Sequence, residues 1–303
     1  MFTDSPEAFV AAAQAAPLQS QTTLKAALLV QDPDYVVATE TAADNMYMNL
    51  DEPAATGAAF AQQSELAAAL RRCGIPTVIF GPLEGASDGI FPNNAFATTP
   101  GKLILGSMRY PNRQRETRRQ DVRDWFTGLL KSQVVDLSLT EGTAELTGAL
   151  VIDHARGVGF CGLSERADLA GAKAMHEAFG LKATLHFPLP ASEYHTNVVL
   201  SVLAGRAAVV YADEPAYEPL QNALDGLYGE WVHYLKAEEK DHFVANCLAV
   251  TPEDVVLSET AWRHCRPETV DFFSRAGFNV RSVDVSELEK AGGSVRCMIG
   301  EIF

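Results

Sequence analysis

A long-period repeat constrains the fold of this chain more than any other feature of its sequence. Five polar residues mark the repeat at intervals of 51, 50, 51 and 51 positions: Asn94, Glu145, His195, Asn246 and Cys297. Each of the first four is followed by an apolar strand, a short turn, a second apolar strand, an amphipathic helix and a third strand. Equivalent positions converge when such units close into a ring, so the five marked side chains are expected to meet.

Each repeated unit has the order β-β-α-β. The first two strands are paired apolar runs around a short turn, typical of a hairpin, at residues 95–107, 148–162, 197–213 and 247–259. Apolar residues at helical spacing follow, at residues 113–132, 166–180, 218–229 and 266–277. The third strands are expected at residues 133–139, 182–187, 230–235 and 279–285.

The two ends of the chain together supply a fifth unit. Residues 294–303 offer only a first strand, while the N-terminal part offers a strand at 25–31, a helix at 63–74 and a strand at 76–80. The predicted fold is therefore α/β: one domain over residues 1–303, built as a five-bladed α/β propeller of ββαβ repeats around a central cavity. Ring closure removes exposed sheet edges. The alternative is an ordinary α/β domain whose regular spacing is accidental.

Charge and cysteine content exclude several classes of function. A formal net charge of −15 argues against a nucleic-acid-binding surface, which needs clustered Lys and Arg. No apolar run approaches the length of a membrane span, and the early run 8–16 is expected to be a first helix. Five scattered cysteines indicate reduced thiols and a cytoplasmic protein. A homo-oligomer is compatible with the sequence.

Two sequence patterns argue against a cofactor or a metal. The segment GVGFCG at residues 157–162 satisfies GxGxxG, but Gly157 falls in a hairpin turn and the following residues fit a returning strand. A dinucleotide fingerprint instead opens a helix after the first strand of a βαβ unit. No HxxxH or HExxH spacing occurs, so no metal site is predicted.

Cys297, His195 and Glu145 are the predicted catalytic residues. A thiol, an imidazole and a carboxylate brought together by the ring would supply a nucleophile, a general acid/base and an orienting group. The glycines before Cys297 allow close approach of a ligand, and Arg296 would lower the thiol pKa if it pointed inward. A lone cysteine is more commonly a buried structural residue, but its place in the repeat favours catalysis.

At this point the motifs resemble a known superfamily, the guanidino-group-modifying enzymes or penteins, which include dimethylarginine dimethylaminohydrolase, arginine deiminase and the amidinotransferases. The resemblance covers nearly the whole chain, and segments 39–49 and 109–116 look similar to its bacterial branch of amidinotransferase-like or citrulline-utilization hydrolases. The matching segments are 292–302 around the cysteine, 194–201 around the histidine, 144–153 around the glutamate and 87–96 in the predicted guanidine-contacting loop.

The resemblance implies specific roles without a cofactor. Cys297 would attack the planar carbon of a guanidino or ureido group, and His195 would protonate the departing nitrogen and then activate water. Glu145 would hold substrate nitrogens or orient His195. The implied substrate-binding residues on a small amino-acid substrate are Asp88, Asn93, Asn94, Arg113, Arg166 and Asn246. For the two arginines, which would pair with a substrate carboxylate, the alternative is a solvated charge next to a helix start.

Three departures from the superfamily pattern bear on the substrate. Asn93 and Asn94 stand where arginine-processing relatives usually carry acids, and an amide suits a neutral ureido group. Asn197 replaces an acid common in deiminases, and Leu146 replaces a glycine that usually follows the glutamate. The sequence therefore favours hydrolysis of a citrulline-like substrate. The alternatives to this citrulline-like hydrolase are an arginine or dimethylarginine hydrolase, an amidinotransferase, and a non-enzymatic ligand-binding propeller. Residues 39–50 are predicted to form a lid.

Overall fold

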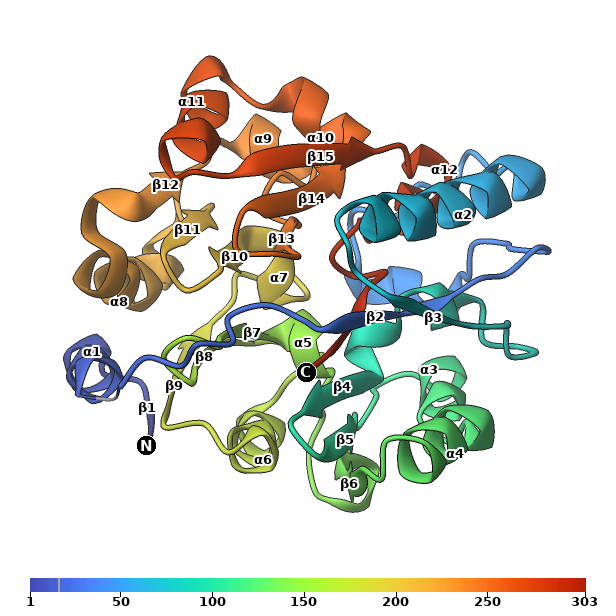
Figure 1. Cartoon of the computed structure of the whole chain (residues 1–303), viewed down its shortest axis with the longest axis horizontal. Coiled ribbons are helices and arrows are strands. Elements are labelled where there is room, and N and C mark those ends of the chain that lie inside the picture. Colours follow the sequence, from blue (N-terminus) through green and yellow to red (C-terminus); the bar gives the residue numbers. More distant parts are fainter. Residues whose placement is uncertain (16) are drawn as a thin grey trace.

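The computed structural model describes residues 1–15 and 17–303, whose strands form five small sheets around a common centre (Figure 1). In each sheet the first strand pairs antiparallel with the second, and the second pairs parallel with the third. The strands, sheet by sheet, are β4 (Phe96–Thr99), β5 (Lys102–Leu105) and β6 (Gln133–Asp136); β7 (Leu150–Asp153), β8 (Val158–Leu163) and β9 (Ala183–Pro188); β10 (Leu200–Leu203), β11 (Ala207–Val210) and β12 (Val232–Tyr234); β13 (Leu248–Ala249), β14 (Asp254–Ser258) and β15 (Asn279–Val283); β16 (Gly300–Ile302), β2 (Ala26–Val30) and β3 (Thr77–Phe80).

The fifth sheet joins the two ends of the chain, as the repeat predicted. β16 runs antiparallel to β2, with Gly300 opposite Leu28, and β2 runs parallel to β3. First strands of neighbouring sheets contact one another, β16 with β4, β7 with β10, and β10 with β13. The predicted ββαβ propeller order is confirmed. One addition was not predicted: β1 (Phe2–Thr3) extends one sheet by pairing parallel with β9.

The longer helices connect second to third strands and cover the outside of the ring (Figure 1). These helices are α2 (Thr56–Arg72), α3 (Pro111–Glu116), α4 (Gln120–Gly128), α6 (Leu169–Phe179), α8 (Glu218–Tyr228), α10 (Glu259–His264) and α11 (Pro267–Arg275). Further helical segments are α1 (Pro6–Gln14), η1 (Glu40–Asp44), η2 (Ser87–Ile90), η4 (Leu137–Leu139), η5 (Pro215–Tyr217), η6 (Gly229–Trp231), α9 (Ala237–Asp241) and α12 (Ser286–Glu289). None of the helices among the described residues is long and apolar enough to cross a bilayer.

One predicted helix is wrong in its extent. The run 113–132 is divided between α3 and α4, because Arg119 adopts extended backbone at the N-cap of α4. Its buried side chain donates to the Gly81 carbonyl at 2.9 Å and pairs with Asp121 at 2.6 Å. These contacts hold the chain out of the helical path. The amphipathic spacing within α4 is as predicted, with Val122 and Phe126 buried.

Short turns, three of them helical, precede the first strands and hold the five marked residues. η3 (Pro92–Asn94), α5 (Leu146–Ala149) and α7 (Thr196–Val199) lead into β4, β7 and β10. Glu145 and His195 are the N-cap residues of α5 and α7. Cys297 was expected at the start of its strand, but it lies in a turn three residues before β16, where its backbone N–H donates to the Ser294 carbonyl.

The GxGxxG pattern lies where the hairpin interpretation placed it. Gly157 has φ +66° in the turn between β7 and β8, a conformation that favours glycine. Residues 158–163 form β8, which pairs with strands on both sides. The segment therefore opens no helix that could receive a dinucleotide phosphate.

Packing at the junction of the two chain ends predicts a large stability effect. Leu28 is 1% exposed on β2, so Leu28→Ala is expected to lower the free energy of unfolding by about 2–5 kcal/mol. Leu18→Ala is the matched control, because that side chain is 68% exposed, and its effect is expected within about 0.5 kcal/mol. Urea unfolding of both variants makes the comparison. Equal midpoints would contradict the packing described for this junction.

Candidate active site

One polar cavity lies where the five units converge. It is lined by Thr41, Asn45, Asp88, Phe91, Asn94, Arg113, Arg166, Tyr194, His195, Ala291, Gly293 and Cys297. Six residues predicted from the sequence line it, whereas Glu145, Asn93 and Asn246 are buried next to those lining residues rather than in the wall. The ring thus brings together residues separated by more than 200 positions.

The Cys297 thiol is buried and held by two amides. Asn246 Nδ2 donates to Cys297 Sγ at 3.3 Å, and Asn197 Nδ2 lies 3.5 Å from the same sulfur. Asn246 is fixed in turn, because its Oδ1 accepts from the Arg296 backbone N–H at 3.2 Å. N–H donors to sulfur favour the thiolate over the thiol. Asn197, noted from the sequence only as a departure, therefore contacts the predicted nucleophile.

Burial nevertheless decides the resting state of the thiol. Burial raises the pKa of Cys297 above its ordinary value, against the smaller lowering effects of Asn246, Asn197 and Arg296. The Arg296 guanidinium lies 3.6 Å from Glu301 in a buried ion pair, and that carboxylate offsets its positive charge. At neutral pH, Cys297 is consequently a thiol until a bound group stabilises its thiolate.

His195 and Glu145 form a buried pair. His195 Nε2 lies 2.9 Å from Glu145 Oε2, and both side chains are inaccessible to solvent. A carboxylate only accepts hydrogen bonds, so Nε2 carries the proton and Nδ1 of the neutral ring has a free lone pair. Nδ1 has no partner among the described residues. This leaves one ring nitrogen of a cavity-lining histidine available for proton transfer.

Charges around the pair keep Glu145 ionised. Burial alone would raise the pKa of Glu145, but Arg166 and His195 hold it well below its usual range. Burial lowers the pKa of His195, with the Glu145 carboxylate opposing that effect. At neutral pH the pair is therefore a neutral imidazole next to a carboxylate, which suits a general base.

The residue after Glu145 carries backbone strain. Leu146 begins α5 with φ +21°, outside the backbone conformations that residues other than glycine prefer. The positive φ gives a physical reason for the glycine that the pentein resemblance implies at this position. Leu146 is fully buried, so packing holds it in this conformation.

Asp88 is a buried carboxylate in the cavity wall with neutral partners. Its Oδ2 accepts from Thr41 Oγ1 at 2.9 Å and from Asn112 Nδ2 at 3.2 Å. No ion pair to Asp88 occurs within the described part of the chain. Because a buried carboxylate without an ion pair is costly, a positively charged group would be stabilised next to Asp88.

Asn93 and Asn94, in the same loop as Asp88, occupy different positions relative to the cavity. Asn94 lines the cavity, and its Oδ1 has no hydrogen-bond partner among the described residues. Asn93 is buried behind it, and neither atom of its amide has a partner there. A methyl group on Gly148 would lie 2.4 Å from Asn94 Oδ1 and 2.8 Å from His195 Nδ1, so Gly148 permits both groups to face the same space.

The two predicted carboxylate-binding arginines are buried and already paired. Arg113 Nε and Nη2 bind both oxygens of Glu116 at 2.7 and 2.8 Å, and Nη2 also donates to the Phe91 carbonyl. Arg166 binds Asp44 and Glu145. The solvated-charge alternative is therefore wrong for both residues: each guanidinium is enclosed by protein.

Sequence reasoning missed three cavity residues, Thr41, Asn45 and Tyr194. The first two lie in segment 39–50, which crosses the cavity: Asn45 Nδ2 donates to the Gly292 carbonyl at 3.3 Å. The Tyr194 ring stacks against His195 with centroids 4.6 Å apart. The polar, non-periodic composition of segment 39–50 indicated a lid but not which of its residues would line the cavity, and Tyr194 begins the histidine motif at 194–201.

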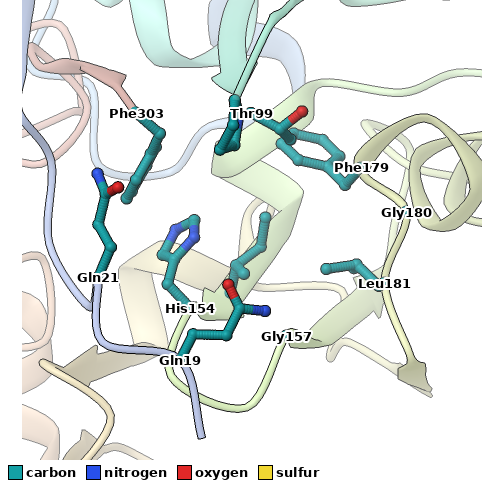
Figure 2. A pocket seen from close by; sticks show the side chains of 11 residues that line it. Gln19, Gln21, Thr99, His154, Gly157, Phe179, Gly180, Leu181 and Phe303 are labelled. Atoms are coloured by element: carbon teal, nitrogen blue, oxygen red, sulfur yellow. The ribbon is translucent and has the colours of Figure 1, made fainter.

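A second hollow lies at the opposite ends of β4, β7 and β16 (Figure 2). None of the predicted site residues lines it. His154 stacks there on Phe303 with centroids 3.9 Å apart, and burial together with Arg296 lowers its pKa to about 3. His154 thus serves as a neutral packing residue. No group of three or more His, Cys, Asp or Glu side chains that could hold a metal occurs within residues 1–15 and 17–303.

A ring of five ββαβ sheets around a buried cysteine, histidine and carboxylate is the arrangement that the pentein resemblance implies. The family model described as "N,N dimethylarginine dimethylhydrolase, eukaryotic" matches residues 32–303. The chain belongs to this family, which confirms the pentein resemblance of its motifs.

Individual relatives agree with this assignment. The N(G),N(G)-dimethylarginine dimethylaminohydrolase of Mycobacterium tuberculosis is 26% identical over 262 residues, covering 85% of this chain and 80% of that protein. The uncharacterized protein YkgA of Bacillus subtilis is 26% identical over 240 residues, covering 78% and 77%. The N-terminal domain of ArgZ, an arginine dihydrolase from cyanobacteria, matches the fold with a TM-score of 0.76 at 18% identity, covering 91% and 97%.

The raised pKa of Cys297 predicts its alkylation behaviour. The thiolate fraction grows only as pH rises through the raised pKa, so labelling by iodoacetamide is expected to be slow at pH 7 and to increase beyond pH about 8.5, the value for a free cysteine. Peptide mass spectrometry across a pH series measures the rate at this site, with Cys297→Ser identifying the peptide. Fast, pH-independent labelling between pH 6 and 8 would contradict a resting thiol.

The space above Gly148 supplies a steric prediction. Gly148→Ala places a methyl group against Asn94 and His195, and a displacement of about 1 Å is expected to lower kcat/KM about 100-fold. The matched control is Gly57→Ala in α2, where a Cβ would meet nothing within 4 Å. Turnover and thermal unfolding are measured for both variants. Full activity in Gly148→Ala would show that the two groups do not share this space during catalysis.

Proposed function

We propose that this chain is a cysteine-dependent hydrolase of a guanidino amino acid, with Cys297 as nucleophile, His195 as general acid/base and Glu145 as the residue that orients the imidazole. The observation that carries the proposal is that Cys297, His195 and Asp88 line one cavity. The Asp88 carboxylate forms no ion pair with the described residues. The membership in the dimethylarginine dimethylhydrolase family supports the same chemistry.

The reaction proceeds in two steps without a cofactor. The sulfur of Cys297 attacks the planar guanidino carbon, while His195 Nδ1 receives the thiol proton. This proton passes to the departing amine as the C–N bond breaks, leaving an S-linked amidino intermediate. Water then loses a proton to His195 and attacks the same carbon, the S–C bond breaks, and the thiol is restored with its proton.

Asp88 favours a cationic substrate. A guanidinium next to this carboxylate would form a charge-assisted pair with short hydrogen bonds. The same positive charge, near Sγ, would offset the burial that raises the pKa of Cys297 and so favour the thiolate. Among relatives, one dimethylarginine dimethylaminohydrolase and the arginine dihydrolase ArgZ, captured with its substrate as a cysteine-to-serine variant, act on guanidino amino acids.

A neutral, citrulline-like ureido amino acid is the second candidate, favoured by Asn94. The unpaired Oδ1 of this residue would accept from a ureido N–H, and its Nδ2 would donate to the ureido carbonyl. Asp88 would then accept from the second ureido N–H. Transfer of the amidino group to an amine instead of water is the remaining outcome for the intermediate.

Free thiols at all five cysteines support a cytoplasmic setting.

A substrate panel tests the proposal. Arginine, dimethylarginine, citrulline and N-acetylcitrulline are supplied in parallel, and ammonia, dimethylamine, ornithine and citrulline are quantified. Turnover of at least one is expected and is abolished in Cys297→Ser, whereas the control Cys73→Ser retains it. Absence of turnover for all four, with no amidino transfer to glycine, would overturn the hydrolase proposal.

Asp88→Asn separates the two substrate candidates. Loss of the carboxylate is expected to lower kcat/KM for arginine or dimethylarginine about 100-fold, because a buried guanidinium then lacks its partner. Turnover of a ureido substrate is expected to change less than about fivefold, because an amide still supplies an acceptor. A change of less than about fivefold for arginine or dimethylarginine would contradict the role of Asp88 as the partner of a guanidinium.

A further inference from the structure

An acidic residue of segment 39–50 reaches the catalytic pair through a single guanidinium. Asp44 Oδ2 accepts from Arg166 Nε at 2.9 Å, and Asp44 Oδ1 accepts from Arg166 Nη2 at 2.6 Å. The remaining nitrogen, Nη1, donates to Glu145 Oε2 at 3.2 Å. That oxygen is the one that binds His195 Nε2. Four side chains therefore form one continuous chain of charge-assisted hydrogen bonds.

The geometry leaves the guanidinium little freedom. A planar fork held on one edge by both oxygens of Asp44 presents its third nitrogen in a fixed direction. The rings of Tyr110 and Tyr194 lie 4.7 and 5.6 Å from Arg166 Cζ, and the arginine side chain is 2% exposed. Nη2 additionally donates to the Thr41 carbonyl at 3.2 Å. The orientation of Arg166 thus depends on segment 39–50, which supplies two of its partners.

The charges of Asp44 and Arg166 also link segment 39–50 to His195. The positive charge of Arg166 opposes protonation of His195, and Asp44 compensates that charge. Asp44 also lies 3.5 Å from Arg109 Nε, but Arg109 is bound to Glu165 as well and is partly exposed. The titratable and charged groups facing His195 from all sides are Glu145, Arg166, Arg113, Asp88, Tyr194 and Cys297.

We propose that Asp44 is a positioning residue, which acts through Arg166 and Glu145 to set the orientation and basicity of His195. The inference rests on the proposed function of His195 and extends it to a residue with no direct contact to the imidazole. It also makes the orientation of the catalytic pair depend on segment 39–50, because Asp44 belongs to that segment.

The test compares Asp44→Asn, which removes the charge at constant size, with Asp44→Glu, which keeps it. Asp51→Asn is the matched control: the same chemical change at an exposed position seven residues along. In Asp44→Asn, kcat is expected to fall about tenfold or more, with KM changing less than about threefold. The acid limb of kcat/KM is expected to move to lower pH, because Arg166, left with Glu145 as its carboxylate partner, disfavours the imidazolium more strongly. Asp44→Glu is expected to restore the position of the limb.

A structural role alone would give a different result. It would lower the amount of folded protein or the melting temperature of Asp44→Asn without moving the pH limb. An unmoved limb, a loss confined to KM, or an equal effect of Asp51→Asn would overturn the proposal.

A second readout keeps this test separate from the proposed function. The NMR titration of the His195 ring nitrogens, assigned by their loss in His195→Gln, needs no substrate. Its midpoint is expected to be lower in Asp44→Asn than in the wild type and in Asp51→Asn. A protein without hydrolase activity that still shows this difference would refute the function and retain the coupling, whereas equal midpoints would refute the coupling itself.

Discussion

The pairing of β16 with β2 is the constraint on which the site depends. This antiparallel contact joins the last strand of the chain to its first sheet and closes the order of five units. Cys297 lies in the turn that leads into β16, so the same contact places the thiol opposite residues from the other blades. Bringing the two ends of the chain together in this pairing costs conformational entropy. The burial of apolar surface in the sheets and helices around the ring offsets that cost.

Within the ring, one carboxylate organises the polar groups. Glu145 accepts from His195 and Arg166 through the same oxygen, and Oε1 accepts from the Arg109 backbone N–H at 3.3 Å. Each of these bonds favours the ionised form in a dry environment, where an unpaired charge would be costly. Because Glu145 is ionised, the imidazole tautomer is settled, and the free nitrogen of His195 faces the cavity.

Charge distribution around the cavity explains why the thiol, the imidazole and the substrate are interdependent. Arg113 and Arg166 in the cavity wall each form ion pairs with protein carboxylates, whereas Asp88 accepts hydrogen bonds only from neutral donors. The cavity would thus suit a cation, and burial favours the thiol form of Cys297. Binding and activation of the nucleophile are expected to be one electrostatic event, since the charge that fills the cavity also stabilises the thiolate.

The sequence by itself determined the ββαβ order and which residues meet, because the repeat period places Asn94, Glu145, His195, Asn246 and Cys297 at equivalent positions. Only the tertiary structure decided what each of them contacts. Asn246 and Asn197 hold the sulfur, and the break before α4 follows from the burial of Arg119. Asp44 meets Arg166 across 122 positions and Asn45 meets Gly292 across 247. No local pattern encodes such contacts: segment 39–50 has no periodicity, and its path is set by the charges and carbonyls presented by distant blades.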